Sequence, residues 1–172
     1  VAFPSRGGRL QVDSSRADSV MGGNITFEQL RIEALGAVSV GPVTATGSLL
    51  TSSGLGTEVP FYRAESIGGI ERLTGLERDA VSGGYAAVAR VGLSYRFGAD
   101  ATAPGDGLRI GVSGETGQAQ PTSVGWSWPP DDMLLGASIW LGLGTPLGPI
   151  TVGFADVEGR KAGWIFQIGA VR

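Results

Sequence analysis

The side chains that could carry out chemistry are few in this chain. The sequence has no His and no Cys, so it cannot supply a Ser-His-Asp triad, a cysteine nucleophile, a disulfide or the commonest zinc sites. It also contains no Gly-x-Ser-x-Gly nucleophile elbow and no coherent pair of carboxylates. We therefore expect no enzyme activity, no catalytic residue, no metal site and no cofactor.

Four charged residues are the best candidates for a polar site: Arg90, Arg96, Arg109 and Glu115. Side chains alternate between the two faces of a β-strand, so these four are predicted to share one face of two neighbouring strands. Two interpretations stay open. The four residues form either a latch that holds a loop inside a barrel or a solvated ladder of ion pairs.

The element that positions two of them is a long alternating segment, residues 85–97. Its apolar face carries Tyr85, Ala87, Ala89, Val91, Leu93, Tyr95 and Phe97. Thirteen residues is long for a soluble strand, which usually has about 5–6. An apolar face that ends in aromatic residues is typical of a lipid-facing strand in an outer-membrane barrel.

Similar alternation predicts eight strands and an all-β fold in one domain, residues 1–172. Glycine makes up 30 of the 172 residues, and no segment shows the period of an amphipathic helix. In the second strand the apolar phase slips between Phe27 and Leu30, which predicts a bulge. The expected strands are 9–18, 24–36, 42–52, 85–97, 108–118, 134–147, 150–157 and 163–171.

The connections and the composition favour a transmembrane β-barrel. Short and long links alternate, and the longest is the loop 53–84, as in barrels with periplasmic turns and extracellular loops. A soluble up-and-down barrel is the alternative. The net charge of −3 gives no basic footprint for nucleic acid. The start of the chain has neither an initiator Met nor a secretory segment, so we expect a mature or truncated product.

Four short motifs, in order along the chain, resemble one known family. They are Phe3-Pro4-Ser5-Arg6-Gly7, then Gly68-Gly69-Ile70-Glu71-Arg72-Leu73-Thr74-Gly75-Leu76, then Gly114-Glu115-Thr116-Gly117-Gln118, and last Thr145-Pro146-Leu147-Gly148-Pro149. They are similar to motifs of the bacterial surface antigen family, the barrel domain of the outer-membrane-protein-85 superfamily. The second resembles the motif on the sixth extracellular loop of that family.

The resemblance implies half of a membrane barrel. The family barrel has sixteen strands, and these motifs correspond to its C-terminal eight. Where translocases of the family carry a loop Arg that pairs with acidic residues of the barrel wall, this chain has Thr74. The Leu73-Thr74-Gly75-Leu76 form is closest to the patatin-like branch. By the same resemblance, Trp164, Phe166 and Ile168 are expected to serve as the barrel-assembly signal.

Glycines on the predicted inward faces bear on stoichiometry. They are Gly92, Gly111, Gly136, Gly142, Gly144, Gly153 and Gly169. Side chains fill the interior of an eight-stranded barrel, so a glycine-lined one would be underpacked. Either the loop 53–84 folds inside, or two chains pair edge to edge into a sixteen-stranded barrel. We favour the pairing, because unpaired strand edges are costly in lipid.

Three classes of function follow from these observations. The first is an outer-membrane barrel unit that acts as a membrane anchor or translocation module, as a homodimer and with a protein passenger. The second is a structural barrel subunit of a larger envelope complex. The third is a soluble ligand-binding barrel.

Overall fold

The protein is organised around eight long strands. The computed structural model describes residues 3–18, 25–70, 72–98, 107–120, 133–145 and 148–169. The long strands are β1 (Gly7–Ala17), β2 (Phe27–Val40), β3 (Val43–Ser53), β6 (Tyr85–Phe97), β7 (Leu108–Gln120), β8 (Leu134–Thr145), β9 (Gly148–Val157) and β10 (Gly163–Ile168). Between β3 and β6 lie the 3-10 turn η2 (Phe61–Arg63) and the two-residue strands β4 (Glu65–Ser66) and β5 (Ser82–Gly83).

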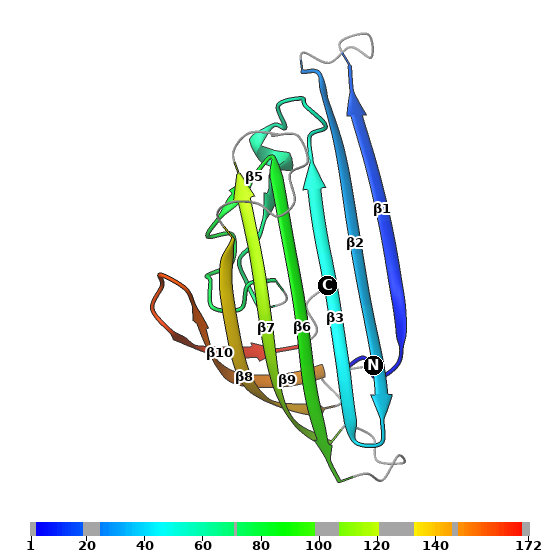
Figure 1. The fold of residues 1–172 in the computed structure, drawn as a ribbon, viewed down its shortest axis with the longest axis vertical. Coiled ribbons are helices and arrows are strands. Elements are labelled where there is room, and N and C mark those ends of the chain that lie inside the picture. The colour runs from blue at the N-terminus through cyan, green and yellow to red at the C-terminus, as the bar shows by residue number, and fades with distance from the viewer. Residues whose placement is uncertain are drawn as a thin grey trace.

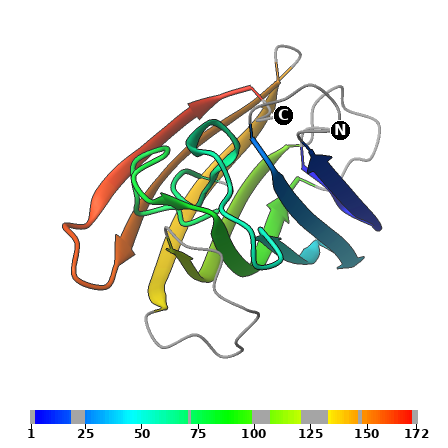
Figure 2. The same ribbon diagram turned by 90° about the horizontal axis from the view of Figure 1, so that it is seen from above.

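The long strands form one antiparallel sheet in the order β1-β2-β3-β6-β7-β8-β9-β10. The sheet curves strongly but does not close, because β1 and β10 are not paired with each other (Figures 1 and 2). The predicted all-β class and the eight antiparallel strands are confirmed. Residues 24, 71, 146, 147, 170 and 171, which we assigned to strands or to the second and fourth motifs, lie outside the described residues.

The outward, convex face of the sheet is apolar along rows of cross-strand neighbours. One row contains Ala45, Leu93, Val112, Ile139, Phe154 and Trp164, and the next contains Val43, Tyr95, Ile110, Leu141, Val152 and Phe166. These side chains are solvent-exposed in the single chain: Leu93 is 55 %, Ile139 51 % and Trp164 83 % exposed. The apolar face predicted for residues 85–97 is therefore the convex face.

The concave face carries polar residues, glycines and an apolar cluster. Its buried polar residues are Gln29, Thr44, Arg109, Ser113, Glu115 and Ser138. The segment 54–84 lies against this face, inside the curve of the sheet (Figure 2). Ile67 and Leu73 of this segment are fully buried. They pack with residues of β3, β6 and β9 in the one apolar core cluster that the described part of the chain contains: Leu50, Ile67, Leu73, Leu76, Ala86, Val88 and Val157.

The concave glycines make room for large side chains. A Cβ at Gly111 would overlap the indole of Trp140, and a Cβ at Gly153 would lie 2.8 Å from Trp140 Cβ. A Cβ at Gly142 would lie 2.5 Å from Phe3 Cζ, and the Phe3 ring stacks on Trp140 at 5.7 Å. This end of the concave face is therefore filled by aromatic rings.

The bulge expected in the second strand is wrong. The register of β2 runs without interruption from Ala17 opposite Phe27 to Gly7 opposite Ala37. Phe27 shares the concave face with Gln29, and both are buried. Phe27 is an apolar residue on the otherwise polar concave side of this part of the strand, and in the sequence it looked like a phase slip.

The packing predicts that Gly111→Ala destabilises the protein. The added methyl group overlaps the Trp140 ring, and overpacking of this kind costs about 1–3 kcal/mol. Gly114→Ala, three residues further along β7 and on its convex face, is the control, because its Cβ would meet only Val91 Cγ2 at 3.9 Å. The midpoint of urea unfolding should fall for the first variant and not for the second. Equal midpoints would contradict the packing of Trp140 against Gly111.

Candidate functional site

The Glu115 carboxylate, on the concave face of β7, is the centre of the site. Its side chain is 0 % exposed. One oxygen accepts a hydrogen bond from the Thr74 backbone N–H, and the other accepts one from the Thr74 hydroxyl. Ser113 Oγ donates a third bond at 2.8 Å. Both oxygens of a buried carboxylate are therefore used, and two of these three hydrogen bonds hold the loop.

Arg90 on β6 completes the site. Arg90 and Glu115 are direct cross-strand neighbours, and Arg90 Nε lies 3.3 Å from Glu115 Oε1. Arg90 Nη1 donates to the Ile70 carbonyl oxygen of the loop, and Nη2 donates to Ser113 Oγ at 3.3 Å. The buried charge is thus paired within the sheet, and both members of the pair bind backbone groups of the loop.

We call this set the loop latch: Thr74, Arg90, Ser113 and Glu115. Arg90 and Glu115 are two of the four charged residues that the sequence singled out, and they contact the loop motif directly. The sequence-based analysis did not include Ser113. Its position on the same face as Glu115, two residues before it, could have identified it.

The loop motif, residues 68–76, presents a compact shape to the latch. Leu73 N–H donates to Ile67 O at 3.0 Å, and Gly69 N–H donates to Leu76 O at 3.2 Å. Gly69 has a φ of +112°, a conformation that side chains oppose. A Cβ at Gly75 would lie 2.5 Å from Val157 Cγ2, so the motif sits tightly against β9. Its residues Gly68, Gly69, Leu73, Thr74, Gly75 and Leu76 form one turn against the sheet.

A second polar contact ties the same segment to β2. Glu65 Oε2 lies 3.1 Å from Arg31 Nε, and Glu65 Oε1 lies 2.6 Å from Arg72 Nη2. Arg31 also lies 2.7 Å from Glu33. The Glu65 side chain is only 13 % exposed. The segment 54–84 is therefore held on the sheet at two places, by hydrogen bonds to Arg90 and Glu115 and by the ion pair between Glu65 and Arg31.

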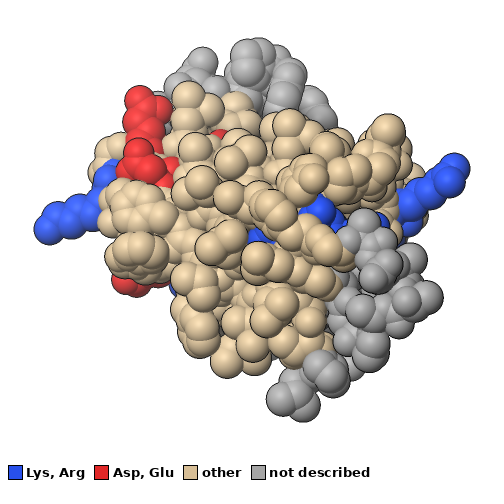
Figure 3. Space-filling view, turned by 90° about the horizontal axis from the view of Figure 1, so that it is seen from below, with Lys and Arg blue, Asp and Glu red and all other residues tan. Residues whose placement is uncertain are grey.

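The other two charged candidates lie away from the loop. Arg96 and Arg109 are cross-strand neighbours of each other near the hairpin-turn end of the sheet. Arg109 is 2 % exposed, with its guanidinium 5.4 Å from the centre of the Phe3 ring and Nη1 3.5 Å from Thr44 Oγ1. Seen from the turn end, most of the described surface is uncharged, and Lys and Arg atoms show near the middle (Figure 3). The latch therefore contains two of the four charged residues that were predicted to share one face.

The predicted assembly signal lies on the edge strand. Trp164, Phe166 and Ile168 of β10 all project from the convex face and are largely exposed. Phe154 contacts Trp164 edge to face at 5.6 Å between ring centres. Trp164, Phe166 and Ile168 are not part of the loop latch.

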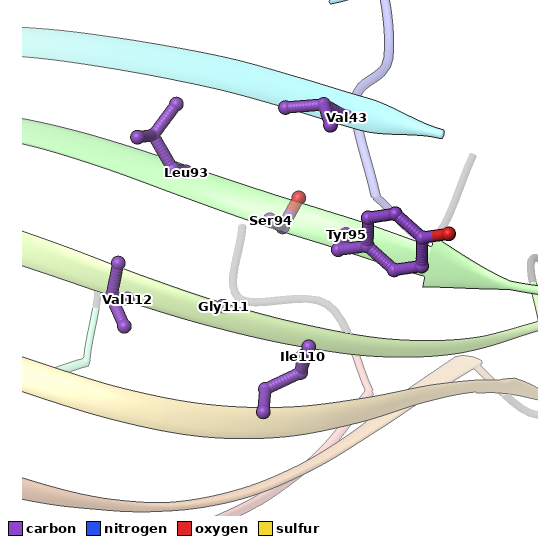
Figure 4. A pocket seen from close by; sticks show the side chains of 7 residues that line it. All are labelled: Val43, Leu93, Ser94, Tyr95, Ile110, Gly111 and Val112. Carbon is purple, nitrogen blue, oxygen red and sulfur yellow. The ribbon is translucent and has the colours of Figure 1, made fainter. Parts of the chain in front are cut away.

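The arrangement holds a loop by hydrogen bonds to a buried charge pair. No group of three or more potential metal ligands gathers in the described part of the chain. A shallow depression lies on the convex face, lined mainly by Val43, Leu93, Tyr95, Ile110 and Val112 (Figure 4). Its side chains offer apolar contact with little hydrogen bonding. Within the described ranges, no helix has the length and apolar character needed to cross a bilayer.

No protein-family model matches this chain, and no curated protein matches it. The geometry of the latch and of the two faces is therefore the basis for a functional proposal.

The latch predicts that Thr74→Val loosens the loop. Removing a hydroxyl donor from a buried carboxylate costs about 1.5–3 kcal/mol, which is roughly a 10- to 100-fold faster opening. Amide hydrogen exchange of the 67–76 peptide should accelerate by that factor in Thr74→Val and also in Glu115→Gln. Thr151→Val, on the concave face of β9, is the matched control. Unchanged exchange in both latch variants would show that the latch does not hold the loop.

Proposed function

We propose that this chain is an outer-membrane β-barrel unit that serves as a membrane anchor. One observation carries the proposal: the exposed apolar convex face, which extends across cross-strand rows from β3 to β10. Monomeric soluble proteins rarely expose a continuous apolar patch larger than a few hundred Å². A lipid bilayer is the partner that covers such a surface on a curved sheet.

The polarity of the two faces supports a membrane over a soluble setting. A soluble up-and-down barrel has apolar residues inside and polar residues outside. Here the concave face buries Thr44, Ser113 and Glu115, while Leu93 and Ile139 on the convex face remain exposed. The exposed apolar convex face is the reverse of the outer face of a soluble barrel, and the concave face combines these polar residues with the apolar cluster under the docked loop.

The unpaired edge strands β1 and β10 favour pairing with a second chain. Unpaired backbone groups cost several kcal/mol each in hydrocarbon, so β1 and β10 need partners. An eight-stranded barrel has an interior just wide enough for side chains. The segment 54–84 lies against the concave face of this sheet (Figure 2), where the side chains of a closed eight-stranded barrel would pack. A second copy supplies the remaining strands of a sixteen-stranded barrel.

The docked loop favours a role as a membrane anchor over a role as an open conduit. Residues 54–84 occupy the space that a translocated chain would cross, and the latch and the Glu65 contacts hold them there. In the family that the sequence resembles, a loop Arg pairs with acidic wall residues. Here the wall supplies both charges, Arg90 and Glu115, and the loop supplies neutral groups. Translocation of a passenger requires release of this latch.

The proposal predicts which tryptophan contacts lipid. Single-tryptophan variants that keep only Trp164 or only Trp140 provide a matched pair, because Trp164 is exposed on the convex face and Trp140 stacks on Phe3 inside. In vesicles of brominated lipid, the fluorescence of Trp164 should be quenched several-fold more than that of Trp140.

Equal quenching of the two variants would contradict the assignment of the convex face to lipid. A protein that stays monodisperse without detergent and binds no vesicles would overturn the membrane proposal and favour a soluble barrel.

The anchor proposal also predicts a closed lumen. Wild-type protein in a planar bilayer should show little ion conductance, whereas a variant with both Thr74→Val and Glu115→Gln should show conductance steps, since the loop is then free to leave the lumen. Steady conductance of the wild type would indicate an open conduit. No conductance in either variant would favour a structural subunit of an envelope complex.

A further inference from the structure

The two free edges of the sheet differ in length and share one polarity pattern. β1 has 11 residues and β10 has 6. On the convex side, β1 presents Leu10 and Val12, which are 70 % and 57 % exposed, and β10 presents Trp164, Phe166 and Ile168. On the concave side, β1 presents Arg9, Gln11 and Asp13, and β10 presents Ile165 and Gln167. The convex sides of the two edges therefore match in apolar character.

The directions of the two strands also fit. All neighbours in the sheet are antiparallel, and the sheet has eight long strands. An even number of alternating strands makes β1 and β10 run in opposite directions. The β10 strand of one copy therefore meets the β1 strand of another copy in the antiparallel sense, at both seams of a two-fold dimer.

The sheet register limits how the edges can align. The row that contains Phe166 passes through Val43 of β3 and reaches Val40 of β2. By the β1–β2 register it would fall at position 4, just before β1. In a closed sixteen-stranded barrel with a strand tilt of about 35–45°, the row is offset along the strands by roughly eight to ten residues for every eight strands. Phe166 of a partner copy then lies opposite Val12 or Ser14, because an odd displacement would reverse the faces.

Side-chain pairing decides between these two registers. With Phe166 opposite Val12, Ile168 lies opposite Leu10 and Trp164 lies opposite Ser14, so two of the three convex pairs are apolar. With Phe166 opposite Ser14, Trp164 lies opposite Arg16, which is already within 3.5 Å of Asp18 and Glu28. Aromatic and β-branched residues that face each other stabilise a seam by about 0.2–1 kcal/mol per pair. The first register has two such apolar pairs, and the second has one, Ile168 opposite Val12.

We propose that β10 of one copy pairs with β1 of a second copy in the register that places Phe166 opposite Val12 and Ile168 opposite Leu10. This inference rests on the proposed membrane barrel. On the concave side the same register places Gln167 opposite Gln11, so that two amides can hydrogen-bond across the seam. Ile165 lies opposite Asp13, whose carboxylate remains 3.5 Å from Arg31 of its own chain.

Cysteine pairs test the register directly, because the chain has no native Cys. The variants are Val12→Cys with Phe166→Cys, Leu10→Cys with Ile168→Cys, and the offset control Ser14→Cys with Phe166→Cys. After mild oxidation of the full chain in detergent or in membranes, the first two should form intermolecular disulfides. The control should give at least about fivefold less dimer, since its Cβ atoms lie a further two residues apart along the strand.

Chains with only Val12→Cys, refolded together with chains with only Phe166→Cys, establish that the bond joins two copies. Crosslinking of the Ser14 pair in place of the Val12 pair would overturn the register and leave the two-copy barrel intact. Disulfides within one chain would overturn the seam between copies. Absence of crosslinks in protein whose Trp164 is quenched by lipid would overturn this seam and leave the membrane proposal standing. Absence of quenching of Trp164 by lipid would contradict the proposed function itself.

Discussion

The buried carboxylate of Glu115 holds a loop where a barrel would otherwise have its interior. It has no access to solvent, so its charge is stable only while Arg90, Ser113 and Thr74 stay in contact with it. Because Thr74 belongs to the segment 54–84, pairing this charge also docks the segment on the concave face. The docked segment lies inside the curve of the sheet, and β1 and β10 are not paired with each other. We propose that the docked segment keeps the sheet from closing and that a second chain supplies partners for the two free edges.

The glycines of the concave face have a different meaning from the one that the sequence suggested. They predicted an underpacked interior, with either a loop folded inside or a second chain as the remedy. Gly111 and Gly153 instead lie against Trp140, and Gly117 lies against Leu73 of the loop, with a Cβ at Gly117 only 2.8 Å from Leu73 Cδ1. The glycines therefore allow close packing of large side chains. The argument for a second copy rests on the loop and the free edges, and not on empty space.

Much of the sheet could be predicted from alternation alone, and the latch could be predicted in part. The side chains of Arg90 and Glu115 share a face because of their parity, and the register sets them directly opposite each other. The contact between Glu65 and Arg31 could not be predicted, because 34 residues separate them and no local pattern positions an irregular loop over β2. Phe27 misled the analysis for a related reason. Where a loop covers the polar face of a strand, that face can also carry an apolar residue such as Phe27. Periodicity cannot distinguish such a residue from a bulge.

The most direct test of this account is the number of chains in the detergent-solubilised particle. Light scattering, corrected for bound detergent, gives that number without any substitution in the chain. We predict a particle of two chains, because one sheet with its loop in place cannot satisfy its own edges in a membrane-like environment. A stable particle of one chain, with segment 54–84 still protected from proteolysis, would contradict the account, since it would mean that eight strands can close around the docked loop.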